Sequence, residues 1–120
     1  AQLSQNMYNS DKFTSDLMNS YAWDTTTVFI QNCGTNSKYS RQNSLNTSLA
    51  QTGTTTDIQC NIYDIASNII EWTTETHASN DPCVGQGGFY YNSGYYTSTR
   101  SSYYTSDSNV YIGFRPLLYL

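Results

Sequence analysis

The first clear pattern of apolar positions lies in residues 13–33, FTSDLMNSYAWDTTTVFIQNC. The pattern predicts an amphipathic helix that covers a core. Its end is expected at Gly34, where a C′ glycine stops a helix. The threonine run at 25–27 lowers helix propensity, so tertiary packing has to hold this segment. The apolar positions of the stripe are Tyr21, Trp23, Val28, Phe29 and Ile30.

Residues 35–57 are polar, lack a regular period, and predict a long irregular loop. Apolar anchors return in residues 60–77, separated by the turn formers Asp64, Ser67 and Asn68. The TTETH that follows Trp72 alternates like a strand. These anchors are Ile62, Ile65, Ile69, Ile70 and Trp72.

The last third alternates aromatic and small polar residues between glycines, which is typical of hairpin strands. It ends on VYIGFRPLLYL, which predicts a closing strand with Pro116 at a sheet edge or a strand end. A length of 120 residues with 38% hydrophobic content fits one domain, residues 1–120, with a single modest core. Because the chain begins with Ala1, we expect a processed chain or a domain excised from a longer one.

Charge excludes one class of partner. The net charge is −4, and the five basic residues are scattered along the chain, so no basic face for nucleic acid is expected. No apolar run is long enough to span a bilayer, so no membrane insertion is expected. The basic residues are Lys12, Lys38, Arg41, Arg100 and Arg115.

Three cysteines, Cys33, Cys60 and Cys83, are widely spaced and form no CxxC or Cys/His cluster. A zinc site is therefore not expected. One disulfide with a free thiol and three buried thiols both remain open, with buried thiols the preferred alternative.

Four stretches carry a family resemblance when they are taken in order: NIYDIASNIIEWTTE, GQGGFYY, STR and IGFRPLLYL. They resemble the formylglycine-generating-enzyme (sulfatase-modifying factor) branch of the C-type lectin fold. That family reads N-x-Y-D-x-x-G-N-V-x-E-W, then R-G-G-S-x, then an arginine, and ends I-G-F-R. The resemblance spans residues 60–120, and YAWDTTTVFI corresponds to the family's helix. It implies an α+β domain, loop-rich, with short antiparallel strands and one or two helices.

The chain departs from the catalytic members of that family. Those members bind copper through two cysteines placed just beyond the R-G-G motif. Residues 89–97 contain no cysteine, and Cys83 precedes Gly87 and Gly88. The sequence therefore predicts a relative without this catalysis.

The resemblance also implies candidate calcium ligands. These are the side chains of Asp64 and Glu71 with the carbonyls of Ser67 and Ile69, and oxygen ligands are those that Ca²⁺ prefers. The alternative, which we favour, is structural: Asp64 caps a turn and Glu71 bonds backbone amides near Trp72. No other cofactor is expected.

Two further motifs have plain structural interpretations. Glu75 and His77 would share one face of a strand, as a solvated surface pair rather than an acid/base pair. GQGG at 85–88 lacks the helix and lysine of a phosphate loop, so close backbone packing before a strand explains it better.

Tyrosine is the residue that the last third accumulates. Eight of the twelve tyrosines lie in residues 85–120, three times as YY. Tyr, Ser, Gly and Asn make binding surfaces that lose little side-chain entropy, as in antibody loops. We expect one ring of each pair to pack inward and its neighbour to face solvent or a ligand. A half-buried sheet chosen for β propensity is the alternative. The candidate ligand-binding residues are Tyr90, Tyr91, Asn92, Ser93, Tyr95, Tyr96, Thr97, Thr99, Tyr103, Tyr104, Ser106, Asp107 and Asn109.

A second resemblance concerns the end of the chain. Non-catalytic relatives of this fold are the variable proteins of diversity-generating retroelements, in which randomised Asn codons precede an end similar to GFRP. Such codons cannot encode Lys, Glu, Gln, Met or Trp, and residues 89–111 contain none of these five. The resemblance implies that exposed residues here vary, while Arg100 and Arg115 are scaffold residues that bond loop carbonyls.

The sequence therefore predicts a non-enzymatic binding domain for a protein or a cell-surface glycan. Its expected location is extracellular, on a cell surface or on a phage virion. One alternative is a self-associating subunit of a pilus or fibre, with the tyrosine face buried against a copy of itself. The other is a degenerate enzyme with a new chemistry in the same cleft.

Overall fold

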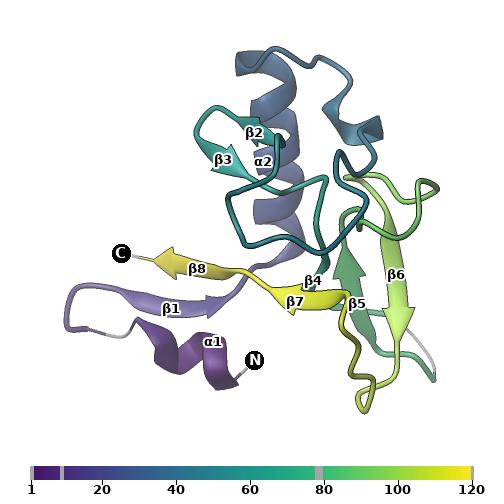
Figure 1. Ribbon diagram of the computed structural model, residues 1–120. Helices are drawn as coiled ribbons and strands as arrows, with labels where there is room; N and C mark the ends of the chain where they lie inside the picture. Colours follow the sequence, from purple (N-terminus) through teal and green to yellow (C-terminus); the bar gives the residue numbers. More distant parts are fainter. Residues whose placement is uncertain (1, 9, 78–79, 120) are drawn as a thin grey trace.

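The computed structural model describes residues 2–8, 10–77 and 80–119 and shows an α+β domain (Figure 1). Helical segments and short strands alternate with long connecting loops. None of the described helices is long and apolar enough to cross a membrane. In chain order the elements are α1 (Gln2–Met7), β1 (Thr14–Leu17), α2 (Ser20–Cys33), the 3₁₀ turn η1 (Tyr39–Arg41), β2 (Ile58–Gln59), β3 (Ile62–Tyr63), β4 (Ile70–Thr76), β5 (Cys83–Gln86), β6 (Arg100–Tyr103), β7 (Ile112–Phe114) and β8 (Pro116–Tyr119).

The largest sheet has the strand order β6-β5-β4-β7. β5 runs antiparallel to both β4 and β6, whereas β7 lies parallel to β4. Next to this sheet, β1 and β8 pair antiparallel, so that the two ends of the chain lie on the same side of the molecule (Figure 1). The N–H of Met18 donates to the carbonyl of Arg115 and ties the two parts together.

Helix α2 is shorter than its sequence pattern predicts, and it shows a different face to the core. It begins at Ser20 because the four residues of β1, inside the predicted helix, pair with β8 instead. Trp23, Thr27 and Ile30 are the buried residues of α2. The expectation that Tyr21, Val28 and Phe29 cover the core is wrong, because all three are exposed.

Local hydrogen bonds explain both the ends of α2 and its threonine run. The Oδ1 of Asn19 accepts the N–H of Ala22 at 2.8 Å and caps the helix. The hydroxyls of Thr26 and Thr27 donate to carbonyls four residues earlier, which satisfies them within the helix. Gly34 ends α2 as predicted, and a Cβ there would lie 2.6 Å from the Ile30 carbonyl oxygen.

The predicted long loop at 35–57 is confirmed apart from η1, and a buried polar contact anchors it. The Tyr39 hydroxyl donates to Oδ1 of Asp57 at 2.8 Å, and Oδ2 of Asp57 accepts the N–H of Ala66 at 2.8 Å. Tyr39 and Asp57 are both almost completely buried. This contact connects the loop to a small core of Met18, Trp23, Ile30, Tyr39, Ile65 and Ala66.

The predicted strand after Trp72 is confirmed by β4, and the turn at Asp64 and Asn68 has positive φ at both residues. The prediction of hairpin strands in the last third is confirmed in part, because β5 and β6 pair antiparallel, but residues 87–99 form a long connection between them. The closing segment is two strands rather than one, and Pro116 begins the second.

Close backbone packing at GQGG is confirmed, although Gly87 and Gly88 follow strand β5 rather than precede a strand. Gly87 has φ +97°, and a Cβ on Gly88 would lie 2.3 Å from the Ala66 carbonyl oxygen. The preference for three buried thiols is wrong for Cys33 and Cys60, which are exposed, while Cys83 is half-buried. All three thiols are free.

Candidate functional site

In each of the three YY pairs, one tyrosine is half-buried and the other is exposed. Tyr90, Tyr95 and Tyr103 are half-buried. Their neighbours Tyr91, Tyr96 and Tyr104 are 81%, 43% and 55% exposed. The division agrees with the expectation of one inward and one outward ring, but strand alternation produces it only at Tyr103. The other two pairs lie in turns.

The inward rings form an aromatic layer centred on Phe89, which is buried. The Phe89 ring stacks on Tyr111 and meets Tyr95 edge-on, both with centroids 4.9 Å apart. Trp72 and Tyr103 make a second edge-on contact at 5.2 Å. Edge-on and offset geometries are those that aromatic pairs prefer, so these rings stabilise the domain.

The outward rings at Tyr91 and Tyr96 lie in turns that many hydrogen bonds hold. The N–H of Gly94 donates to Oδ1 of Asn92 at 2.8 Å, and the N–H of Tyr96 donates to Oγ1 of Thr99 at 2.8 Å. Asn43 reaches from the long loop and donates its amide to the Ser93 carbonyl. We call the exposed residues here the 91–96 patch: Tyr91, Asn92, Ser93 and Tyr96.

Thr97 is a correction to the predicted contact set. It is completely buried, its N–H donates to the Gln42 carbonyl at 2.9 Å, and its carbonyl accepts Nε1–H of Trp23 at 2.9 Å. Thr97 therefore belongs to the scaffold, where it connects the long loop and α2 to the tyrosine-rich segment. Thr99 is half-buried and supports Tyr96 through the bond described above.

The remaining predicted residues lie at the other end of β6. We call them the 104–109 patch: Tyr104, Ser106, Asp107 and Asn109, all exposed. The N–H of Tyr104 donates to Oδ2 of Asp107, and the N–H of Asp107 donates to the Tyr104 carbonyl. β6 has four residues, so about 10 Å of strand separates the two patches. The segments before and after β6 lie at opposite ends of that strand (Figure 1), so the single face expected from the sequence is divided into two patches.

The 104–109 patch borders a pocket of about 410 Å³ that the sequence did not reveal. Trp72 and Pro82 contribute apolar surface to it, and Tyr104 and Asp107 stand at its rim. Leu17 of β1 also lines the pocket. Residues from three distant parts of the chain meet here, which is why no local pattern signalled the pocket.

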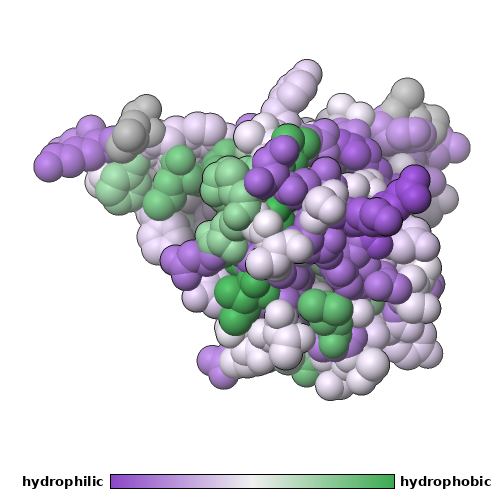
Figure 2. Space-filling model, turned by 90° about the horizontal axis from the view of Figure 1, so that it is seen from above, coloured by the Kyte–Doolittle hydropathy of each residue, from purple (hydrophilic) through white to green (hydrophobic). Residues whose placement is uncertain are grey.

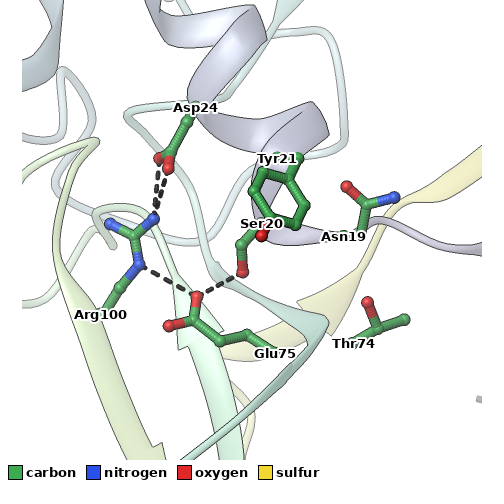
Figure 3. A pocket seen from close by; sticks show the side chains of 7 residues that line it. All are labelled: Asn19, Ser20, Tyr21, Asp24, Thr74, Glu75 and Arg100. Carbon is green, nitrogen blue, oxygen red and sulfur yellow. Dashed lines mark hydrogen bonds and ion pairs between the residues drawn. The ribbon is translucent and has the colours of Figure 1, made fainter.

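A second pocket, of about 450 Å³, lies at the start of α2 (Figure 3). Arg100 spans its wall, with Nη2 2.7 Å from Oδ2 of Asp24 and Nε 3.0 Å from Oε2 of Glu75. The sequence led us to expect that Arg100 bonds loop carbonyls. Instead, two carboxylates hold it.

Several donors converge on one oxygen of Glu75 in this second pocket. Its Oε2 also accepts Nε2–H of Gln86 at 2.8 Å and the hydroxyl of Ser20. Burial raises the pKa of Glu75, but the bonds from Ser20, Arg100 and Gln86 outweigh burial and hold this pKa below its ordinary value. His77 is exposed beyond the end of β4, and its backbone N–H donates to the Pro82 carbonyl.

The residues considered for calcium do not fit a metal. Both oxygens of Glu71 accept bonds from Arg115, at 2.8 and 2.9 Å, and a divalent ion placed there would be repelled by the guanidinium. The oxygens of Asp64 accept the N–H of Gly53 and the hydroxyl of Thr55. Within the described ranges no three His, Cys, Asp or Glu residues converge as metal ligands.

The alternative to calcium, in which Asp64 caps a turn and Glu71 bonds backbone amides, differs from the structure in two details. Glu71 bonds a guanidinium rather than backbone amides, and Asp64 bonds a neighbouring loop. Arg115 also donates to the carbonyl of Tyr63 in β3 at 2.9 Å, so it bonds a strand carbonyl and a carboxylate rather than the expected loop carbonyls. Burial raises the pKa of Glu71, and the charge of Arg115 opposes that rise.

No family model matches the chain, and neither the curated proteins nor the solved structures contain a match to it.

Proposed function

We propose that this chain is a non-enzymatic ligand-binding domain that displays tyrosine rings to a protein or a cell-surface glycan. The observation that carries the proposal is the division of each YY pair into a packed ring and an exposed ring. Because the packed rings fix the backbone, the exposed rings are held ready for contact. Such preorganisation lowers the entropy cost of binding.

Composition supports the same function. The exposed turns combine Tyr with Asn, Ser and Asp, and burial of amphipathic rings gives most of the energy in interfaces of this type. We also propose that the α+β scaffold is of the C-type lectin type, because its sequence motifs follow each other in the same order as the motifs of that family. Under this proposal the domain works outside the cell or on a phage virion, where surface targets are accessible.

The binding test uses the purified chain, biotinylated at its N-terminus, on printed glycan arrays and on panels of bacterial cells. We expect Tyr91→Ala with Tyr96→Ala, or Tyr104→Ala, to lower binding about tenfold or more. The matched control is Tyr21→Ala, because Tyr21 is 87% exposed but lies on α2. Binding that persists after all three tyrosines are replaced contradicts the proposal.

We further propose that the two patches are positions of diversification. They contain exposed Tyr, Asn, Ser and Asp, all of which randomised Asn codons encode. Thr97 and the inward rings would stay constant, because they hold the scaffold. Sequencing the adjoining DNA tests this. A reverse transcriptase gene with a near-copy of the 3′ coding region, differing at adenines, is expected, and its absence removes diversification but leaves binding.

The alternative of a self-associating subunit has one supporting observation. Val28 and Phe29 are exposed next to each other on α2, although their residue types favour burial. In this alternative the exposed surface would be covered by another copy of the chain. The two functions predict different effects of substitution on the molar mass of the chain in solution.

A further inference from the structure

The pocket beside the 104–109 patch lies at an irregularity in the main sheet. Trp72 pairs with Gly85 and Thr76 pairs with Cys83, so three residues of β4 stand opposite one of β5. This bulge in β4 lies beside a hollow of about 410 Å³, which residues 72–76 help to line. Ligand pockets in proteins are about 300–1,000 Å³.

The walls of this hollow include fixed aromatic rings. Trp72 is half-buried and is held edge-on by Tyr103. Tyr104 is more than half exposed, and the reciprocal bonds between Tyr104 and Asp107 hold its turn. Pro82 adds further apolar surface. A ligand with an apolar face would therefore find preformed surface to pack against.

The rim of the hollow is rich in hydroxyl groups. Thr74, Thr76 and Thr105 are exposed and line it, and each hydroxyl can both donate and accept a hydrogen bond. Asp107 uses Oδ2 to hold the Tyr104 N–H, while no described residue donates to its Oδ1. The rim can thus exchange several hydrogen bonds with a polyhydroxylated ligand.

Charge narrows the ligand class further. Among the described residues, the pocket is lined by no Lys and no Arg, whereas Asp107 and Glu75 both line it. Sulfated, phosphorylated or carboxylated ligands would be repelled. Arg100 and two other donors already occupy Oε2 of Glu75, so Asp107 is the acidic side chain of the lining that remains for a ligand, as a hydrogen-bond acceptor.

We propose that this pocket binds one neutral hexopyranose unit, an inference that rests on the ligand-binding function proposed above. A pyranose has an apolar C–H face, which packs on Trp72 and Tyr104. Its hydroxyl edges bond Asp107 and the threonine hydroxyls. The 91–96 patch, at the other end of β6, contacts a separate part of the same target.

The test uses the ¹⁵N-labelled whole chain and three probes, the methyl pyranosides of glucose, galactose and mannose. The chain has two tryptophans, so its NMR spectrum has two indole N–H signals. A pocket ligand should shift the Trp72 signal together with the amides of Tyr104 and Asp107. The Trp23 signal is the internal control, because that ring is buried and bonds Thr97.

Three variants assign the contact. Tyr104→Ala should weaken the sugar about fivefold, whereas Tyr104→Phe, which keeps the ring, should change affinity less than about twofold. Asp107→Asn should also weaken binding while it retains an acceptor for the Tyr104 N–H, so that the turn survives. Tyr21→Ala is the matched control and should leave the titration unchanged.

Several outcomes overturn the proposal. The first is no response of the Trp72 signal to any of the three sugars, and the second is a response that Tyr104→Ala leaves unchanged. The third is a response to methyl choline ethers, which are quaternary ammonium cations, but not to sugars. If the Trp72 signal stays still while array or cell binding depends on Tyr91 and Tyr96, the pocket proposal fails alone. If sugars shift Trp72 but neither arrays nor cells bind the chain, the display function fails alone.

Discussion

Asp57 and Glu71 are buried carboxylates, and each is held by named donors. Tyr39 and Ala66 donate to Asp57, and Arg115 donates to Glu71. Burial raises the pKa of both groups above the ordinary values, despite these donors. A raised pKa means that the folded chain binds protons more tightly than the unfolded chain.

Stability should therefore increase when the pH falls from about 7 toward the ordinary carboxyl pKa of about 4. For a raised carboxyl pKa, the added stability is complete below the ordinary value and is lost as the pH rises through the folded-state value. The effect of Glu75 on stability has the opposite sign. Its pKa is lowered, so the stability that it contributes is lost only as the pH falls below the ordinary carboxyl pKa. We therefore expect the free energy of unfolding to be largest in mild acid.

Urea unfolding followed by tryptophan fluorescence across this pH range checks the prediction. Asp57→Asn is the matched variant, because it keeps an acceptor for Tyr39 but cannot titrate. This variant should be less stable, by about 1–3 kcal/mol, and should show a smaller rise in mild acid. A wild-type free energy of unfolding that falls steadily below neutral pH contradicts the assignment.

The Arg115–Glu71 ion pair gives a second residue-level prediction. Arg115→Met leaves the Glu71 carboxylate buried without its partner and should cost about 3–5 kcal/mol of unfolding free energy. Adding Glu71→Gln removes the buried charge and should recover part of this loss. Equilibrium urea titrations of both variants measure their free energies of unfolding. Equal stability of the single and double variants would exclude the loss of a paired charge as the cause.

Among the elements, α2 shows what the sequence can and cannot predict. Its end at Gly34 could be predicted, because the glycine signal is local. Its start could not, because β1 is defined by its partner β8, with Asp16 opposite Leu117. A pairing so far along the chain overrides local helix preference.

The cap of α2 gives an element-level prediction. Asn19→Ala removes the acceptor of the Ala22 N–H and should lower the free energy of unfolding by about 1 kcal/mol. Asn19→Asp keeps an acceptor at the helix N-terminus and should cost less. The control is Asn32→Ala, an exposed asparagine in the last turn, and the measurement is chemical unfolding. Equal losses for Asn19→Ala and Asn19→Asp would mean that the cap contributes little.

The candidate site was predictable in part for a similar reason. The YY pairs predict one inward and one outward ring, because neighbouring residues of a strand point to opposite faces, but of these rings only Tyr103 lies in a strand. The pocket depends instead on pairing across the sheet, since Cys83 stands opposite both Thr76 and Tyr103. That arrangement brings Trp72 close to Tyr104, and no local spacing encodes it.

At the scale of the whole molecule, apolar and polar surfaces are unevenly distributed. In Figure 2, apolar side chains form a band over the half of that face toward β1 and β8. Hydrophilic side chains cover much of the half toward β5 and β6. The exposed rings of the YY pairs lie at the ends of β6, and the exposed Val28 and Phe29 lie on α2. A contact between copies could thus use either surface, and the two choices have different consequences for function.

The display function requires that the tyrosines stay free in whatever oligomeric state the chain adopts. We expect Tyr91→Ala with Tyr96→Ala to leave the molar mass from light scattering unchanged over a range of concentrations. If copies associate through α2, Val28→Ser with Phe29→Ser should lower that mass, because it removes the apolar contact surface while the buried Trp23 and Ile30 keep the core. A fibre built through the tyrosine face predicts the reverse. In that case the tyrosine variant alone dissociates, and the exposed rings are then subunit contacts rather than a binding surface.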